Sequence, residues 1–395
     1  MKIAIITDSF SPLTNSGAIQ VMDLALELIR QGHQVTVITP SSEIVVSFSI
    51  ERKEDMQIIR LKSPKMRDVN YIRRVIAEFL MPFAMIFNFK LSSILDSQFD
   101  GVVTYAPSIF LGPIAKRIKK KSECKHYLII RDIFPQWAVD LGLIRYNRIP
   151  YYFFKYIEKN LYSTADIIGI QSLANMPYFE KEVSENVTIE VLNNWWAESK
   201  PKPCSLIVKE SILKGRKIFV YAGNMGDAQG LSIFIDLAAS LQKDKSIGFL
   251  FVGRGSSVGL LKDDVRSRNL DNILFYNEID PQEIQALYKQ CDVGIVSLDS
   301  RHTTHNVPGK FLSYMQSGLP VLAAINSGND LESLIKKNKV GCVTTIHSVD
   351  LLRSLVREII ENLLTDDGTK EKCLKLYKDM FLPNKVAEQI IAKLV

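Results

Sequence analysis

The residues best suited to chemistry lie where a loop runs into a helix expected at 309–317. The first backbone N–H groups of a helix have no partner within it and lie at the positive end of its dipole, so this point can hold an anion. Gly309 lets an anion approach closely, Lys310 adds a positive charge, and Val307 lies just before them. A capped helix carrying an exposed lysine is the structural alternative.

Two further groups in the second half could also contact a ligand. His302 and His305 stand near each other, but no third ligand lies nearby, so contact with a substrate is favoured over a metal site. Arg254 stands between Gly253 and Gly255 after a strand expected at 247–252. The glycine spacing is GxGxxxG, and no acid ends a following strand, which disfavours a nicotinamide cofactor. Arg254 could instead reach an anion or lie in solvent.

In the first half, polar residues follow two expected strands. Gly17 lies between a strand at 2–7 and a helix at 17–30, and Arg131 and Asp132 end a strand at 126–131. Ligands of open α/β sheets bind beyond the carboxyl ends of the strands, so these side chains should lie near a ligand. A buried structural ion pair is the alternative. The aromatic pair in Asn193–Trp196 could support a sugar or fill a domain junction.

Short apolar runs alternate with amphipathic helical stretches along the whole chain, which is typical of parallel strands covered by helices. The pattern breaks at Ser199–Pro203, which has the composition of a linker. The expected strands of the first half are 2–7, 34–39, 101–105, 126–131, 167–171 and 188–192. Those of the second half are 217–221, 247–252, 273–275, 293–296, 320–324 and 341–344. We therefore predict two doubly wound α/β domains.

Composition excludes several classes of protein. The 395 residues are 47% hydrophobic and 23% charged, which excludes a small module and a disordered chain. The net charge of +6 is too small for a dedicated nucleic-acid binder. Five widely spaced cysteines indicate neither a disulfide framework nor a zinc site and fit a reducing compartment. The first residues form a strand rather than a signal peptide.

Basic charge is concentrated in one part of the chain. Between Arg60 and Arg131, fourteen Lys and Arg face five Asp and Glu, an excess larger than that of the whole protein, and we expect one basic face there. The apolar run 79–87 is too short to span a bilayer. Together with the bases at 116–121 and the aromatic stretch 145–156, it could lie on an anionic membrane surface. Core aromatics beside a solvated basic face are the alternative.

Several motifs resemble the retaining glycosyltransferases of family 4. They are Gly32–Val37, Arg131–Pro135, Ala165–Asp166, Val191–Trp195, Tyr221–Asn224 and Pro308–Val321. The resemblance covers essentially the whole chain and implies the GT-B architecture, two facing Rossmann-like domains with a nucleotide sugar in the cleft. The implied boundaries are an acceptor-side domain at 1–200, a donor-binding domain at 201–375 and a C-terminal helix at 376–395 that packs back on the first. The residues of Pro308–Val321 and Arg131–Pro135 most resemble those of the bacterial O-antigen and capsule transferases that add N-acetyl-L-fucosamine.

The sequence departs from this family at four positions of the second half, and in the first half the His common in the family is replaced in the Arg131–Asp132 stretch. His305 and Ser313 stand where family members usually carry two glutamates, the second of which grips the ribose. Asn224 and Gln229 replace the usual Arg and Lys that hold the diphosphate. The residues expected in catalysis are Arg131, Asp132, His305 and Lys310. The residues expected to bind the donor are Gly17, Asn224, Arg254, Glu278, Val307, Gly309, Lys310 and Ser313.

The resemblance implies transfer of a 6-deoxyamino sugar from a UDP-sugar to a polyprenyl-diphosphate-linked saccharide, with retention of configuration, in O-antigen or capsule synthesis. No metal, bound cofactor or nucleic acid is expected. The expected location is cytoplasmic, peripheral on the inner face of the cell membrane through the first domain. The alternatives are a non-catalytic sugar-nucleotide-binding subunit and a sugar-nucleotide epimerase.

Overall fold

The chain forms two compact units. The computed structural model describes residues 1–13, 15–66, 70–91, 97–106, 108–198, 201–301, 303, 305–365 and 368–395. Unit 1 comprises Met1–Trp195 and Pro383–Val395, and unit 2 comprises Trp196–Leu382. The sequence placed the corresponding boundaries at 200 and 376. Of the expected linker, Ser199 and Lys200 lie outside the described residues.

Unit 1 is built on an eight-stranded sheet in the order β3-β4-β2-β1-β5-β6-β7-β8. The strands are β1 (Lys2–Thr7), β2 (Gln34–Ser41), β3 (Phe48–Lys53), β4 (Met56–Lys62), β5 (Gly101–Ala106), β6 (Lys125–Ile130), β7 (Ile167–Ile170) and β8 (Thr188–Val191). All neighbours pair in parallel except β3 and β4, an antiparallel hairpin that the sequence analysis missed. Its turn places Glu54 and Asp55 at positive φ.

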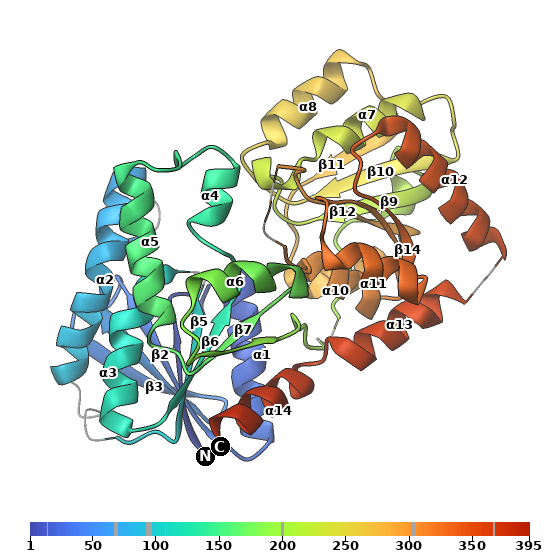
Figure 1. Ribbon diagram of the computed structural model, residues 1–395. Coiled ribbons are helices and arrows are strands. Elements are labelled where there is room, and N and C mark those ends of the chain that lie inside the picture. Colours follow the sequence, from blue (N-terminus) through green and yellow to red (C-terminus); the bar gives the residue numbers. More distant parts are fainter. Residues whose placement is uncertain are drawn as a thin grey trace. The chain divides into compact units, whose positions relative to one another are not determined.

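Helices cover both faces of this sheet (Figure 1). They are α1 (Ser16–Arg30), α2 (Tyr71–Leu91), α3 (Gly112–Ser122), α4 (Gln136–Asp140), α5 (Ile149–Tyr162), α6 (Met176–Glu182) and α14 (Pro383–Leu394). Alternate residues of β1 point to opposite faces. Ala4 and Ile6 join the core under α2, α3 and α5, while Ile3 and Ile5 join the core under α1 and α14. The C-terminal helix therefore packs on the first unit, as expected.

Unit 2 is built on a parallel six-stranded sheet in the order β11-β10-β9-β12-β13-β14. The strands are β9 (Lys217–Ala222), β10 (Ile247–Val252), β11 (Ile273–Tyr276), β12 (Val293–Ser297), β13 (Val321–Ala324) and β14 (Gly341–Thr344). The helices are α7 (Ser232–Ser240), α8 (Val258–Ser267), α9 (Ile284–Tyr288), α10 (Gly309–Gln316), α11 (Asp330–Asn338), α12 (Val349–Thr365) and α13 (Thr369–Met380). The strand order reverses between β9 and β12, and a doubly wound sheet binds its ligand beyond such a switch point.

In the part of the chain that the structure describes, no helix is both long and apolar enough to cross a membrane.

Candidate functional site

Lys310 lies at the switch point of unit 2. Its Nζ is 4.7 Å from the ring centroid of Tyr221, near the end of β9. A Cβ atom added to Gly223 would lie 2.9 Å from the Cε of Lys310, so a larger residue there would displace the end of the lysine side chain. Lys310 stands in the first turn of α10, as the sequence predicts, and its amine lies over the end of the neighbouring strand β9.

The first turn of α10 begins at Gly309, followed by Lys310. Pro308 precedes the helix in an extended conformation and makes no side-chain cap. Val307 is buried in the core of unit 2, while Gly309 is half-buried. The charge of Lys310 and the uncapped helix start therefore occupy one location, where both favour a negatively charged group.

The two glycines around Arg254 serve backbone packing. A Cβ at Gly253 would lie 2.1 Å from the carbonyl oxygen of Gly223, and a Cβ at Gly255 would lie 2.3 Å from that of Met225. These glycines let the loops after β9 and β10 pack backbone against backbone. Arg254 projects outward between them and forms an exposed ion pair with Glu278 at 3.1 Å. Such a pair contributes little to stability, so Arg254 can exchange partners at small cost.

Asn224 and Gln229 shape the loop after β9. The Oε1 atom of Gln229 accepts hydrogen bonds from the Asn224 side chain at 3.1 Å and from the Gly226 backbone at 2.9 Å. Ser313 is buried in α10, and its hydroxyl donates to the carbonyl of Lys310 at 3.0 Å. The hydroxyl hydrogen of Ser313 is thus used within the helix.

His305 lies beside the end of β13. Its Nδ1 is 3.1 Å from the side-chain nitrogen of Asn326, and its ring faces Gly328. Asn326 is almost completely buried. His302, the other member of the histidine pair, lies outside the described residues. Within the described ranges, no group of three His, Cys, Asp or Glu is arranged to hold a metal ion.

In unit 1, Arg131 is turned inward at the end of β6. Its guanidinium donates to Gln20 at 3.0 Å, to the hydroxyl of Tyr105 at 2.9 Å and to Ser16 at 2.9 Å. Burial lowers its pKa, but nearby Tyr105 and Asp132 outweigh this, so the net shift is upward. Arg131 therefore anchors the start of α1 through neutral partners, whereas Asp132 is exposed.

Gly17 belongs to the same network. A Cβ there would lie 3.4 Å from the Tyr105 ring and 3.6 Å from the Arg131 guanidinium. Gln20 is the residue that the sequence analysis missed, although it is fully buried and contacts both. The available signal was a polar residue on the buried stripe of α1, beside Val21 and Ala18.

The two adjacent tryptophans belong to different units, Trp195 to unit 1 and Trp196 to unit 2. Trp195 is fully buried in unit 1, packs edge-on against Tyr105 and donates from its indole to the Gln20 carbonyl. It therefore fills the core rather than supporting a sugar. Trp196 belongs to unit 2, where its ring lies 3.7 Å from a Cβ position at Gly309.

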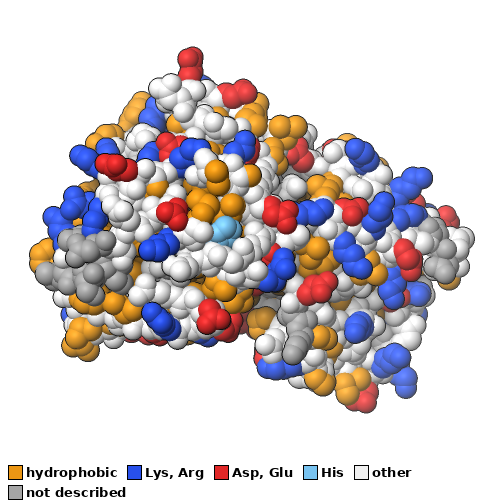
Figure 2. All heavy atoms as spheres, turned by 90° about the horizontal axis from the view of Figure 1, so that it is seen from below, with side chains coloured by type: hydrophobic (Ala, Val, Ile, Leu, Met, Phe, Trp, Pro, Cys, Tyr) orange, Lys and Arg blue, Asp and Glu red, His pale blue; other side chains and the backbone are white. Residues whose placement is uncertain are grey.

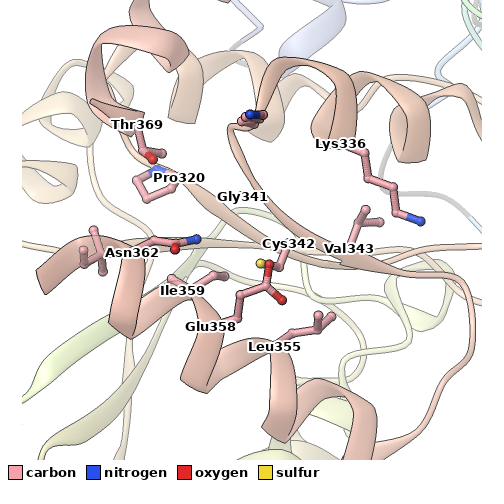
Figure 3. A pocket seen from close by; sticks show the side chains of 12 residues that line it. Pro320, Lys336, Gly341, Cys342, Val343, Leu355, Glu358, Ile359, Asn362 and Thr369 are labelled. Carbon is pink, nitrogen blue, oxygen red and sulfur yellow. The ribbon is translucent and has the colours of Figure 1, made fainter. Parts of the chain in front are cut away.

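A cavity of about 460 Å³ lies elsewhere in unit 2, at the amino end of β14 (Figure 3). Figure 3 shows Glu358, on α12, turned toward Cys342, on β14. Burial and then Glu358 raise the pKa of the Cys342 thiol to about 12. The thiol is therefore not a nucleophile at neutral pH, and the cavity lies at the opposite strand ends from Lys310.

The chain is similar to known proteins in sequence and in fold. Residues 206–376 match the family described as glycosyl transferases group 1. "Probable glycosyltransferase WbjE" of Pseudomonas aeruginosa is 23% identical over 62% of this chain and 62% of its own length. "Putative colanic acid biosynthesis glycosyl transferase WcaI" of Escherichia coli K12 is 24% identical over 80% and 82%.

Two solved structures share the fold over nearly the full chain. Sucrose-phosphate synthase from Thermosynechococcus elongatus has a TM-score of 0.75 at 16% identity, covering 99% of this chain and 98% of its own. HepE from Anabaena, solved in complex with UDP, has a TM-score of 0.71 at 14% identity, covering 100% and 99%. The two-domain α/β fold expected from the sequence is thereby confirmed as GT-B.

Proposed function

We propose that this chain, whose residues 206–376 match the group 1 glycosyl transferases, transfers a sugar from a UDP-sugar donor with retention of configuration. The observation that carries the proposal is the position of Lys310, whose amine lies against Gly223 at the switch point between β9 and β12. A diphosphate bound beyond these strand ends would meet a cation and an uncapped helix start. The UDP complex of HepE supports the same ligand class.

The reaction breaks the bond between the anomeric carbon and the diphosphate oxygen, and the electron pair leaves with the phosphate. The acceptor hydroxyl oxygen forms the new bond to that carbon, and its proton passes to the departing phosphate oxygen. Negative charge grows on the departing phosphate, so cations that are already in place lower the barrier most. Lys310, Arg254 and the start of α10 supply that charge in this proposal.

Lys310→Met tests the assignment, because methionine keeps most of the side-chain volume and removes only the charge. UDP release with donor and acceptor present should fall on the order of 10²–10³-fold. Lys336→Met is the matched control, since Lys336 is exposed on α11 of the same unit. An unchanged rate in Lys310→Met would refute the role of Lys310.

For the donor sugar, we propose N-acetyl-L-fucosamine or a similar 6-deoxyamino sugar, and for the acceptor a polyprenyl-diphosphate-linked saccharide of O-antigen or capsule synthesis. The residues of the family motifs support the choice of sugar, and the name of WcaI, which refers to colanic acid, supports a role in polysaccharide synthesis. A panel of nucleotide sugars should give thermal stabilisation that grows with the ratio of concentration to Kd. Equal stabilisation by UDP-glucose and UDP-N-acetyl-L-fucosamine would contradict the sugar assignment.

A lipid-linked acceptor requires the enzyme to work at a membrane, and α2 offers a suitable face. One stripe of α2 is buried, including Met81 and Met85. A second apolar stripe is exposed, with Phe83 at 54% and Phe87 at 64%. Because the protein core covers only one apolar side of α2, the other side can contact a second apolar environment.

The exposed face continues from α2 onto α5. The rings of Phe79 and Phe153 are 5.7 Å apart and join the two helices. On α5, Ile149 is 86% exposed, and Tyr152 and Tyr156 follow at helical spacing. We name the exposed apolar residues of these two helices the α2–α5 face. It comprises Ile76, Phe79, Leu80, Phe83, Phe87, Ile149, Tyr152 and Tyr156.

Basic residues flank this face, but not all those expected from the sequence. Arg73, Lys90, Arg145 and Arg148 are exposed at its ends. Lys119 instead pairs with Asp166 at 2.7 Å and donates to a backbone carbonyl.

Two residues of the expected basic face lie apart from α2 and α3, which carry most of the others. Arg60 pairs with Glu51 on the β3–β4 hairpin, and Arg131 is turned inward. The surface in Figure 2 likewise shows Lys and Arg interspersed with Asp and Glu.

We propose that the α2–α5 face docks on the anionic inner leaflet, which makes the protein cytoplasmic and peripheral. Each nearby basic residue contributes about 1 kcal/mol on an anionic surface, and the aromatic side chains add apolar contact. Arg145→Glu with Arg148→Glu should weaken vesicle co-sedimentation, and salt should weaken that of the parent. Phe83→Glu should abolish it, while Leu260→Glu on α8 should not. Parent protein that forms dimers through this face and ignores anionic vesicles would overturn the proposal.

A non-catalytic sugar-nucleotide-binding subunit is the second candidate. It is favoured by His305 and Ser313 at the positions of the family glutamates and by the use of the Ser313 hydroxyl within α10. Such a subunit would bind UDP-sugar without releasing UDP. An epimerase would convert the donor with no acceptor present. The UDP-release assay, run with and without acceptor, separates these activities.

A further inference from the structure

A chain of hydrogen bonds from the start of α11 determines the tautomer of His305. It begins at the backbone N–H of Leu331, which can only donate, and which donates to the side-chain oxygen of Asn329 at 3.0 Å. The Asn329 amide is therefore oriented without ambiguity, and its Nδ2 faces the other way. This bond is the N-terminal cap of α11.

The next link orients Asn326. The Nδ2 of Asn329 donates to the Oδ1 of Asn326 at 3.0 Å, so the Nδ2 of Asn326 must face away from Asn329. Asn326 and Asn329 are 1% and 3% exposed, and buried amides keep such bonds because water is not there to replace them.

The last link reaches the imidazole ring. The Nδ2 of Asn326 is 3.1 Å from the Nδ1 of His305. An amide nitrogen only donates, so Nδ1 must accept, and the ring hydrogen of neutral His305 stands on Nε2. A Cβ at Gly328 would lie 3.7 Å from both Cε1 and Nε2, so this edge of the ring is in van der Waals range of the Gly328 position.

We propose that Asn326 and Asn329 are positioning residues that hold His305 as a neutral Nε2–H donor, and that the donor sugar presents an acceptor oxygen to it. The second half of this inference rests on the proposed function. A carboxylate at this position would accept a hydrogen bond, whereas His305 gives one. The preferred sugar group is accordingly a hydroxyl or amide carbonyl oxygen, rather than a group that can only donate.

Nitrogen NMR on histidine-labelled protein tests the tautomer directly. The chain has five histidines, so His305→Gln identifies the signal by its loss. The parent should show Nε2–H. Asn326→Asp replaces the donor with an acceptor and should move the hydrogen to Nδ1. Asn329→Asp keeps the oxygen that caps α11 but lacks the donor to Asn326, and should give a mixture of the two tautomers.

Transfer kinetics provide the second readout. Asn326→Asp should lower kcat about tenfold, the value of one hydrogen bond. In the His305→Gln background, the same change should have no further effect, which a merely structural role would not explain. Nδ1–H in the parent, or an unchanged tautomer in Asn326→Asp, would overturn the positioning role. A parent with Nε2–H but no transfer with any donor would instead refute the proposed function and with it the sugar contact.

Discussion

His126 should make the folded state sensitive to mild acid. It is fully buried in β6, with Nε2 2.8 Å from the hydroxyl of Thr104 and Nδ1 3.1 Å from the carbonyl of Thr164. Burial lowers its pKa from 6.5 to about 4. The unfolded chain therefore binds a proton between these values that the folded chain does not bind. The resulting stability is complete above pH 6.5 and is lost as the pH falls toward 4.

The size of the effect follows from the shift. Between the unfolded-state pKa of 6.5 and pH 5.0 there are about one and a half pH units. Lowering the pH from 7.5 to 5.0 should therefore reduce the unfolding free energy by ~2 kcal/mol. Urea unfolding of the parent and of His126→Gln at both pH values measures it. The glutamine side chain can still bond to Thr104 but does not titrate, so its loss on acidification should be ~2 kcal/mol smaller. His347→Gln, a half-buried histidine in unit 2, serves as the control. The reasoning is refuted if His126→Gln and the parent lose the same stability.

Three other changes test the packing. Ending the chain at Leu382 removes α14 and uncovers the core of unit 1, so thermal melting should fall and the truncated protein should aggregate; a full melting temperature would contradict this packing. Gly253→Ala drives a Cβ into the Gly223 carbonyl and should both lower the melting temperature of unit 2 and weaken UDP binding by calorimetry. Lys155→Met leaves the buried Glu158 without its 2.5 Å partner and should cost about 3–5 kcal/mol in urea unfolding. The double variant with Glu158→Gln should recover part of that stability.

The amino-acid sequence by itself determined the strand and helix alternation of both units. The spacing of apolar residues within each segment indicates a helix or a strand without reference to the rest of the chain. Most elements therefore begin and end within a few residues of their expected bounds. The start of α10 with Gly309 and Lys310 was also visible, because helix starts carry their own residue signals. The β3–β4 hairpin was missed since β3 is an exposed edge strand, and its turn has Glu54 and Asp55 where glycine or asparagine would have signalled it.

Only the tertiary structure decided which of the candidate site residues contact one another. Arg131 was visible at a strand end, but only the packing of α1 against β5 brings Gln20 and Tyr105 to its guanidinium. Asn326 carries no sequence signal, because its role comes from two amides and a ring that separate loops place together. The exposed apolar stripe of α2 has the same helical period as the buried stripe. Periodicity reports that a face is apolar, whereas only the neighbouring elements determine whether that face is covered.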